Sequence, residues 1–183
     1  MNPVDDFVLS ALFQAKGLLD SRHFKALVVG NQSQNFCSGA QLQMILELSI
    51  AKKWNLLEKI SKEFQNINLL FKHSPYPVVT APHGMTLGGG MELTLAGQKR
   101  VAYSELYGGL VEVGVGLLPG GGGCLMLLQQ FINSMKPKNP GPMMPIQAAF
   151  ELIAFGTVTK SADDAVEKGF LTREDVLVHN KDS

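Results

Sequence analysis

The sequence predicts a single α/β domain over residues 1–183. Two observations support this. Short runs of β-branched and aliphatic residues alternate with longer segments of helical periodicity. The 19 glycines are concentrated around positions 84–123, where the two kinds of segment meet. With 45% hydrophobic and 17% charged residues, the chain is typical of a soluble globular protein that buries a substantial core.

The first elements follow from the spacing of the apolar residues. Asn2 is expected to cap a helix that has Pro3 at its first position and that ends near Asp20. Residues 26–30 then form a short buried strand, and residues 31–39 form a polar loop. Two helices are expected over residues 40–51 and 55–72.

The glycine-rich middle of the chain predicts two strands and two helices. The strands are expected over residues 75–81 and 100–103. The first helix begins at Gly88–Gly90 and ends near Ala96, and the second, over residues 124–132, follows Gly120–Gly123. Prolines and lysines then predict an exposed loop over residues 135–144, and residues 145–183 are expected to form a C-terminal helical segment. In that segment Ser161 begins a capping box and Gly169 ends the helix.

Charge and cysteine content exclude several classes of protein. The formal net charge is zero, so neither nucleic acid nor an anionic membrane is an expected partner. No apolar run is long enough to span a bilayer, and the acidic start lacks the features of a secretory signal. Cys37 and Cys124 match no metal-ligand spacing, which leads us to expect a reduced, cytoplasmic setting and no metal site.

Two glycine runs can be interpreted chemically. Gly88–Gly90 at a helix start leaves backbone N–H groups available to an anion, although close packing of two backbone segments is an alternative. Gly120–Gly123 lacks the Lys-Ser/Thr of a phosphate loop, and Gly114-Val-Gly116 lacks the third glycine of a dinucleotide fingerprint. Tight turns and close helix packing are the simpler interpretation of residues 114–123.

Two glutamates accompany these runs. Glu92 lies in the first turn of the predicted helix, where the helix dipole favours an ionised carboxylate; it is either a surface acid or a proton acceptor. Glu112 is flanked by valines and leucines, which suggests a largely buried strand or loop and a raised pKa, unless the side chain points outward. Together they form a potential acceptor and donor for acid–base catalysis. Cys37 and Ser38 lack a recognisable partner for nucleophilic catalysis, and His83 is interpreted as a packing residue.

Three segments in order resemble the crotonase (enoyl-CoA hydratase/isomerase) superfamily, and the likeness covers most of the chain. Residues 36–42, Phe-Cys-Ser-Gly-Ala-Gln-Leu, resemble the first oxyanion-hole segment of that family. Residues 83–93 resemble the second, and residues 112–123 resemble the segment with the second catalytic acid. The separation of 20 positions between Glu92 and Glu112 also agrees with the hydratase pattern.

This resemblance implies a crotonase-like fold of repeated ββα units and hydration of 2-enoyl-CoA to 3-hydroxyacyl-CoA in fatty-acid β-oxidation. The backbone N–H groups of Ala40 and Gly89 would form the oxyanion hole, Glu92 would activate water, and Glu112 would protonate the α-carbon. The expected substrate contacts are Ser38, Gly39, Gly88, Leu117, Pro119 and Gly120. The coenzyme A thioester is the substrate, and no cofactor or metal is expected in this domain.

Residues 109–117 further resemble a branch in which the hydratase is joined to an NAD-dependent 3-hydroxyacyl-CoA dehydrogenase. Compared with the family, the chain lacks opening strands and closing helices, so we expect a fragment, incomplete at both ends, whose own activity is open. Gln41 stands where the family usually has Asp. The family also implies a homotrimer or higher homo-oligomer. Alternatives are an enoyl-CoA isomerase or acyl-CoA hydrolase on the same fold, and a non-catalytic assembly module.

Overall fold

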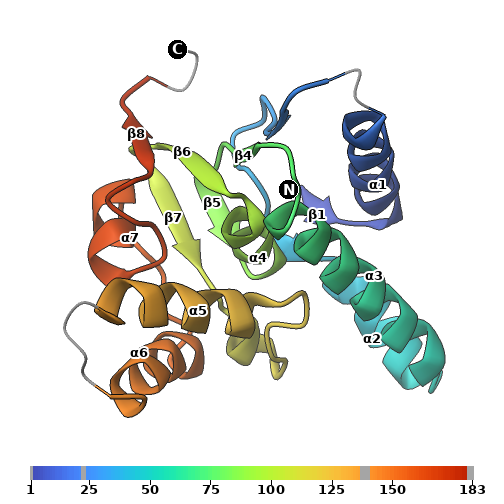
Figure 1. Ribbon diagram of the computed structural model, residues 1–183. Helices are drawn as coiled ribbons and strands as arrows, with labels where there is room; N and C mark the ends of the chain where they lie inside the picture. Colours follow the sequence, from blue (N-terminus) through green and yellow to red (C-terminus); the bar gives the residue numbers. More distant parts are fainter. Residues whose placement is uncertain (1, 22–23, 137–140, 181–183) are drawn as a thin grey trace.

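The computed structural model describes residues 2–21, 24–136 and 141–180, and it has the predicted α/β architecture (Figure 1). Four parallel strands form the main sheet, in the order β2 (Leu27–Val29), β4 (Val78–Thr80), β6 (Lys99–Tyr103) and β8 (Val176–Val178). Two smaller parallel pairs join β1 (Pro3–Val4) to β3 (Gly39–Ala40) and β5 (Gly84–Leu87) to β7 (Leu106–Gly109). A bridge between Cys37 and Thr86 links these two pairs.

The chain passes through the two groups of strands in a repeating order. Each of β2, β4 and β6 is followed by a strand of the smaller pairs and then by helix, because parallel neighbours need a long crossover connection. The helices of these crossovers are α2 (Leu42–Ile50) with α3 (Trp54–Lys72), then α4 (Gly89–Ala96), then η1 (Glu112–Val115, 3₁₀) with α5 (Gly123–Met135). This repeat is the ββα unit that the resemblance implied.

Helix α4 lies at the centre of the molecule. All eight of its residues are buried, and it packs against α3, α5, β3 and β5 (Figure 1). Gly90 allows one of these contacts, because a Cβ atom there would lie 2.4 Å from the Cys37 carbonyl oxygen. Close backbone packing, the alternative interpretation of Gly88–Gly90, therefore holds at Gly90.

The predicted start of the first helix is wrong. Helix α1 (Asp6–Asp20) begins after Asp5, whose carboxylate accepts the Val8 N–H at 2.8 Å. Asn2 does not cap the helix: its amide donates to the Asn35 carbonyl at 3.2 Å, while Pro3 belongs to β1. The extended backbone of β1 thus takes the place of the expected first turn.

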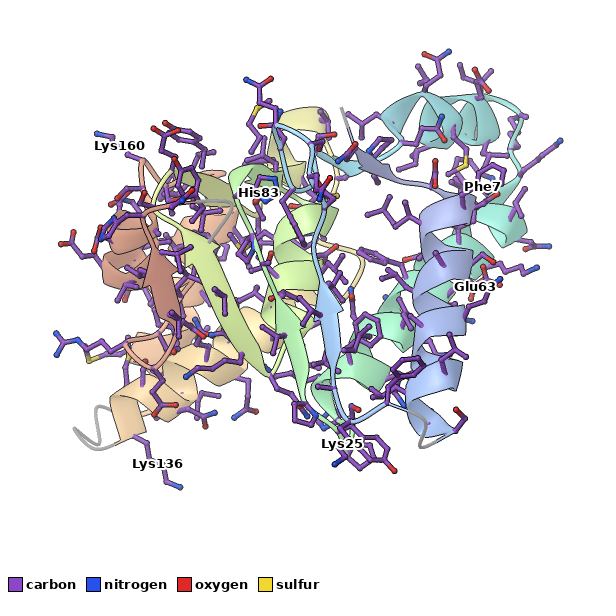
Figure 2. The ribbon with its side chains drawn as sticks, turned by 90° about the horizontal axis from the view of Figure 1, so that it is seen from above. Phe7, Lys25, Glu63, His83, Lys136 and Lys160 are labelled. Atoms are coloured by element: carbon purple, nitrogen blue, oxygen red, sulfur yellow. The ribbon has the colours of Figure 1, made fainter. Side chains whose placement is uncertain are left out.

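Further differences concern the strands and the chain after α5. Strand β2 was predicted to be buried, but it lies at an edge of the sheet and Val28 is 66% exposed. The expected loop over 135–144 is shorter, because Met135 ends α5 and Met143 begins α6 (Met143–Ala154); residues 137–140 lie outside the described residues. Lys136 points outward in Figure 2.

The C-terminal segment contains α6, α7 (Ala162–Lys168) and also β8, so its description as helical was incomplete. The predicted cap of α7 is confirmed, since the Ser161 hydroxyl accepts the Asp164 N–H and Gly169 ends the helix at φ +84°. None of the helices in the described ranges is long and apolar enough to cross a membrane.

Candidate active site

Glu92 occupies the first turn of α4, at the centre of the protein. Its side chain is 2% exposed, so the interpretation as a surface acid is wrong. Its Oε1 atom accepts two backbone hydrogen bonds of 2.8 Å, from the N–H groups of Gly121 and Gly123. A Cβ atom on Gly121 would lie 2.7 Å from Glu92 Oε2, and one on Gly123 would lie 2.9 Å from Glu92 Cγ. The absence of side chains at both glycines lets the turn close around the carboxylate.

Burial dominates the electrostatics of Glu92. Desolvation raises the pKa of this carboxyl to about 7; the hydrogen bond from Gly123 opposes the rise, the charge of Glu112 adds to it, and the bond from Gly121 opposes it again. Desolvation therefore outweighs the helix dipole, which we expected to keep this carboxylate ionised. A carboxyl with a pKa near neutrality can both accept and release a proton under physiological conditions.

Glu112 begins η1 and is the second buried carboxyl. Both of its side-chain oxygen atoms are inaccessible and have no hydrogen-bond partner among the described residues. Desolvation raises its pKa, as the sequence predicted. The prediction that the strand or loop around it is largely buried is wrong, however, because Val113, Val115 and Leu118 are exposed on a 3₁₀ turn and the loop that follows.

Gly88 and Gly89 bring the helix start close to Glu112 and to strand β3. Gly88, at φ +53°, faces Glu112: a Cβ atom on it would lie 3.2 Å from Glu112 Oε1. A Cβ atom on Gly89 would lie 3.6 Å from the Ala40 nitrogen, and one on Gly39 would lie 3.4 Å from the Gly89 nitrogen. As the first residue of α4, Gly89 has no intrahelical acceptor for its N–H. The backbone nitrogens of Ala40 and Gly89 therefore lie near each other, beside the carboxyls.

The other predicted substrate contacts are spread along two loops. Ser38 is half-buried directly before β3, and Gly39 in β3 has a φ of +95°. Leu117, Pro119 and Gly120 lie on the connection between η1 and α5, where Pro119 is buried and the other two residues are exposed. Gly39 thus lies next to the Gly89 nitrogen and Gly88 next to the Glu112 carboxyl. Leu117, in contrast, lies farther out, on an exposed apolar segment.

Sequence reasoning missed a group of residues on α3. The Gln65 amide donates to the Gly120 carbonyl at 2.7 Å, the Ser61 hydroxyl donates to the same carbonyl at 3.4 Å, and the Asn68 amide donates to the Gly121 carbonyl at 2.9 Å. Polar residues on an amphipathic helix are normally interpreted as its solvent-facing side, so no sequence signal distinguished these. The N–H groups of Gly121 and Gly123 face Glu92, which supports the earlier rejection of a phosphate loop.

The remaining candidates have structural explanations. Burial raises the pKa of the Cys37 thiol, which opposes formation of a nucleophilic thiolate. His83 is buried as predicted, with Nδ1 3.3 Å from the Ala81 carbonyl and Nε2 2.9 Å from the Ser33 carbonyl; Figure 2 shows it inside the molecule. Within the described ranges, no group of three or more His, Cys, Asp or Glu side chains could hold a metal ion.

Comparison with known proteins identifies the family. Residues 10–134 match the enoyl-CoA hydratase/isomerase family. The chain belongs to this family. A probable 3-hydroxyacyl-CoA dehydrogenase of Bacillus subtilis is 43% identical over 168 residues, which are 91% of this chain and 21% of that protein. The fatty acid oxidation complex subunit alpha of Vibrio parahaemolyticus is 41% identical over 110 residues, 58% of this chain and 15% of that protein. The chain thus spans about a fifth or less of the length of these two relatives.

Solved structures show the same fold. An enoyl-CoA hydratase from Bacillus anthracis superposes with a TM-score of 0.78 at 23% identity, covering 97% of this chain and 61% of that one. An enoyl-CoA hydratase from Thermoplasma volcanium gives a TM-score of 0.77 at 22% identity, covering 98% of this chain and 64% of that one. At these identities the superpositions establish the crotonase-like fold.

Proposed function

We propose that this protein hydrates a 2-enoyl-CoA thioester to the 3-hydroxyacyl-CoA. The proposal rests above all on the buried pair of Glu92 and Glu112, whose pKa values are both raised, beside the backbone nitrogens of Ala40 and Gly89. Adding water to a conjugated thioester requires a base for the water, an acid for the α-carbon and donors for the negative charge on the thioester oxygen. These groups supply all three roles.

In the proposed reaction the thioester oxygen accepts hydrogen bonds from the N–H groups of Ala40 and Gly89. Ionised Glu92 takes a proton from water as the oxygen of that water bonds to the β-carbon. The π electrons of the double bond shift toward the carbonyl, and the charge collects on the thioester oxygen. Glu112 acts in its protonated form, which desolvation favours by raising its pKa, and delivers its proton to the α-carbon. Water is thereby divided across the double bond, and a proton exchange between the carboxyls and solvent restores the starting state.

The test measures hydration of a short 2-enoyl-CoA through loss of the conjugated thioester absorbance, with chromatography of the product. Glu92→Gln and Glu112→Gln are each expected to reduce kcat by about 10²-fold or more, the usual range for removal of an acid or base. Glu151→Gln, on the exposed face of α6, is the matched control and should retain full activity. Full activity in both active-site variants would refute the mechanism, and a shifted double bond in the product would identify an isomerase instead.

The proposal also covers a neighbouring enzyme activity, the cellular compartment and the oligomeric state. The relative from Bacillus subtilis is named a probable dehydrogenase of the 3-hydroxyacyl-CoA that hydration produces. We propose that this domain works beside such an activity, with NAD bound only there, in the cytoplasm and as a homotrimer or larger homo-oligomer. Sedimentation of the purified chain tests the last of these, and a monomer at all concentrations would refute it.

A further inference from the structure

One face of α3 lies against the turn that holds Glu92. Ser61, Gln65 and Asn68 are four and three positions apart, so they share that face, and each donates a hydrogen bond to a carbonyl of the turn. Phe64 lies between them: a Cβ atom on Gly121 would meet its ring at 2.4 Å, and one on Gly89 would meet it at 3.2 Å. The same helix face thus contacts both the turn over residues 120–123 and the start of α4.

The contact with Gln65 reaches Glu92 through a single peptide group. The carbonyl of Gly120, which accepts the Gln65 amide at 2.7 Å, belongs to the same peptide unit as the N–H of Gly121. That N–H donates to Glu92 Oε1 at 2.8 Å. Hydrogen bonds in such a chain polarise one another, so the Gln65 amide strengthens the donor that the carboxylate uses.

Asn68 holds the next peptide unit, through the Gly121 carbonyl. Its side chain is fully buried, and its Oδ1 atom has no hydrogen-bond partner among the described residues. A buried amide whose oxygen has no hydrogen-bond partner lowers the stability of the protein. An apolar side chain at this position would avoid that cost. In return, the hydrogen bond from Asn68 fixes the peptide group that lies between the Gly121 and Gly123 N–H groups, the two donors to Glu92.

Few other titratable groups lie near Glu92 to influence the ionisation of its carboxyl group. Strands β1, β3 and β5, which pack against α4, contain no titratable side chain, and α5 contributes only Cys124, with Glu112 on η1. On α3, Lys72 donates to the Leu95 carbonyl at the far end of α4. The other charged residues of α3 lie at its outer, exposed or half-exposed positions: Glu58, Lys59, Lys62 and Glu63. The turn is therefore the principal polar contact of α3 with the site.

We propose that Gln65 and Asn68 are positioning residues that hold the Gly120–Gly123 turn against Glu92 and so set the orientation and proton affinity of its carboxylate. Their role in catalysis rests on the proposed function, in which Glu92 must be ionised to activate water. Losing the Gln65 amide weakens the Gly121 donor, destabilises the carboxylate and moves its ionisation to higher pH. Because Gln65 is exposed, its replacement leaves the burial of Glu92 unchanged.

The experiment titrates Glu92 directly. Protein labelled with ¹³C at glutamate carboxyls is followed by NMR over pH, and the signal that Glu92→Gln removes is assigned to Glu92. Gln65→Met, which keeps length and helix propensity but removes the donor, should raise the titration midpoint by about 0.3–0.5 pH unit. Gln147→Met, on the exposed face of α6, is the matched control and should leave it unchanged. A midpoint in Gln65→Met equal to that of the wild type overturns the proposal.

Hydration kinetics give the second readout. The acidic limb of the pH profile should move upward with the titration midpoint in Gln65→Met, and Asn68→Leu should move both in the same direction. If the wild-type chain hydrates no enoyl-CoA, the proposed function fails while the NMR titration still decides whether the turn is controlled from α3. A shifted limb without a shifted Glu92 midpoint would refute the role assigned to these two residues.

Discussion

At the residue scale, burial and hydrogen bonding act on Glu92 in opposite directions. Its pKa of about 7 in the folded protein exceeds the ordinary value of 4.5, so the folded state holds the proton more tightly than the unfolded chain does. This contribution to stability is fully present below pH 4.5 and is lost as the pH rises through 7. The ionised group is then a buried charge that opposes folding.

Replacing Glu92 by Gln removes that charge and keeps an acceptor for the Gly121 and Gly123 N–H groups. Glu92→Gln should therefore gain stability relative to the wild type by about 2–3 kcal/mol between pH 4.5 and pH 8. Urea denaturation followed by circular dichroism at both pH values measures this difference. An unchanged difference between the two proteins would show that Glu92 ionises in the folded state as it does in the unfolded chain.

Two neighbouring glycines provide a second prediction at this scale. A Cβ atom on Gly121 would lie 2.4 Å from two ring carbons of Phe64, whereas one on Gly120 would lie no closer than 3.4 Å to its neighbours, the Ser61 hydroxyl and, at 3.8 Å, the Leu118 carbonyl oxygen. Gly121→Ala should destabilise the protein by about 1–3 kcal/mol, the typical cost of overpacking, and should disturb the Glu92 contacts. Gly120→Ala should fold with nearly wild-type stability in the same denaturation experiment. Equal stability of the two variants would contradict the close packing of α3 on the turn.

The sequence alone pointed to the candidate site residues but not to their surroundings in the folded protein. Both glutamates and the glycine runs were identified from the sequence, because a carboxylate among apolar residues and a glycine-rich helix start are unusual locally. Burial of Glu92 was not predicted, since it depends on α3 and α5, which contact α4 only in the folded structure. The exposure of Val113 and Val115 was missed for a related reason: an apolar run does not reveal whether neighbouring elements cover it.

At the element scale, a buried ion pair fastens β8 to the main sheet. The guanidinium of Arg100 in β6 lies 2.9 Å from the Asp175 carboxylate, and both side chains are at most 5% exposed. The sequence carries no sign of this pair, because its two members lie 75 positions apart in the chain. The carboxylate also accepts the N–H groups of Arg100 and Thr172, so it fixes the turn before β8.

Removing one member of this pair leaves the other charge buried. Asp175→Ala should cost about 3–5 kcal/mol in the free energy of unfolding. Glu63→Ala, which breaks the exposed pair with Lys59 on α3, should cost no more than about 1 kcal/mol. Guanidinium denaturation of both variants makes the comparison, and a similar small cost for each would mean that β8 does not depend on the ion pair.

The helices were easier to predict than the strands. Apolar residues at helical spacing, together with the glycine runs and the capping box at Ser161, predicted the helices α1 to α5 and α7 to within a few residues. Strands β5, β7 and β8 have three or four residues each, and β7 ends in Gly108 and Gly109, which carry no pattern. These strands form because a neighbouring strand supplies their hydrogen bonds, and short sequences do not encode that pairing alone.

At the scale of the whole molecule, stability is distributed unevenly around α4. All residues of α4 are buried, whereas none of the residues of α2 is, and Leu46 and Ile50 remain exposed on it. Helix α2 lies along α3, and Figure 1 shows this pair extending from the body of the molecule. Fewer packing contacts therefore hold α2 in place than hold α4.

Hydrogen exchange tests this distribution. Few buried contacts hold α2, so its amides should exchange through local opening, at free energies well below that of global unfolding. Amides of α4 should exchange only when the whole protein unfolds, and destabilising variants such as Asp175→Ala should therefore accelerate exchange in α4 more than in α2. Mass spectrometry of peptides covering residues 42–50 and 89–96 gives both rates. Equal protection of the two helices in a dilute, ligand-free sample would refute the predicted difference in local stability between α2 and α4. Added acyl-CoA that slowed exchange in α2 alone would support a contact between the proposed substrate and this helix, which begins directly after Gln41.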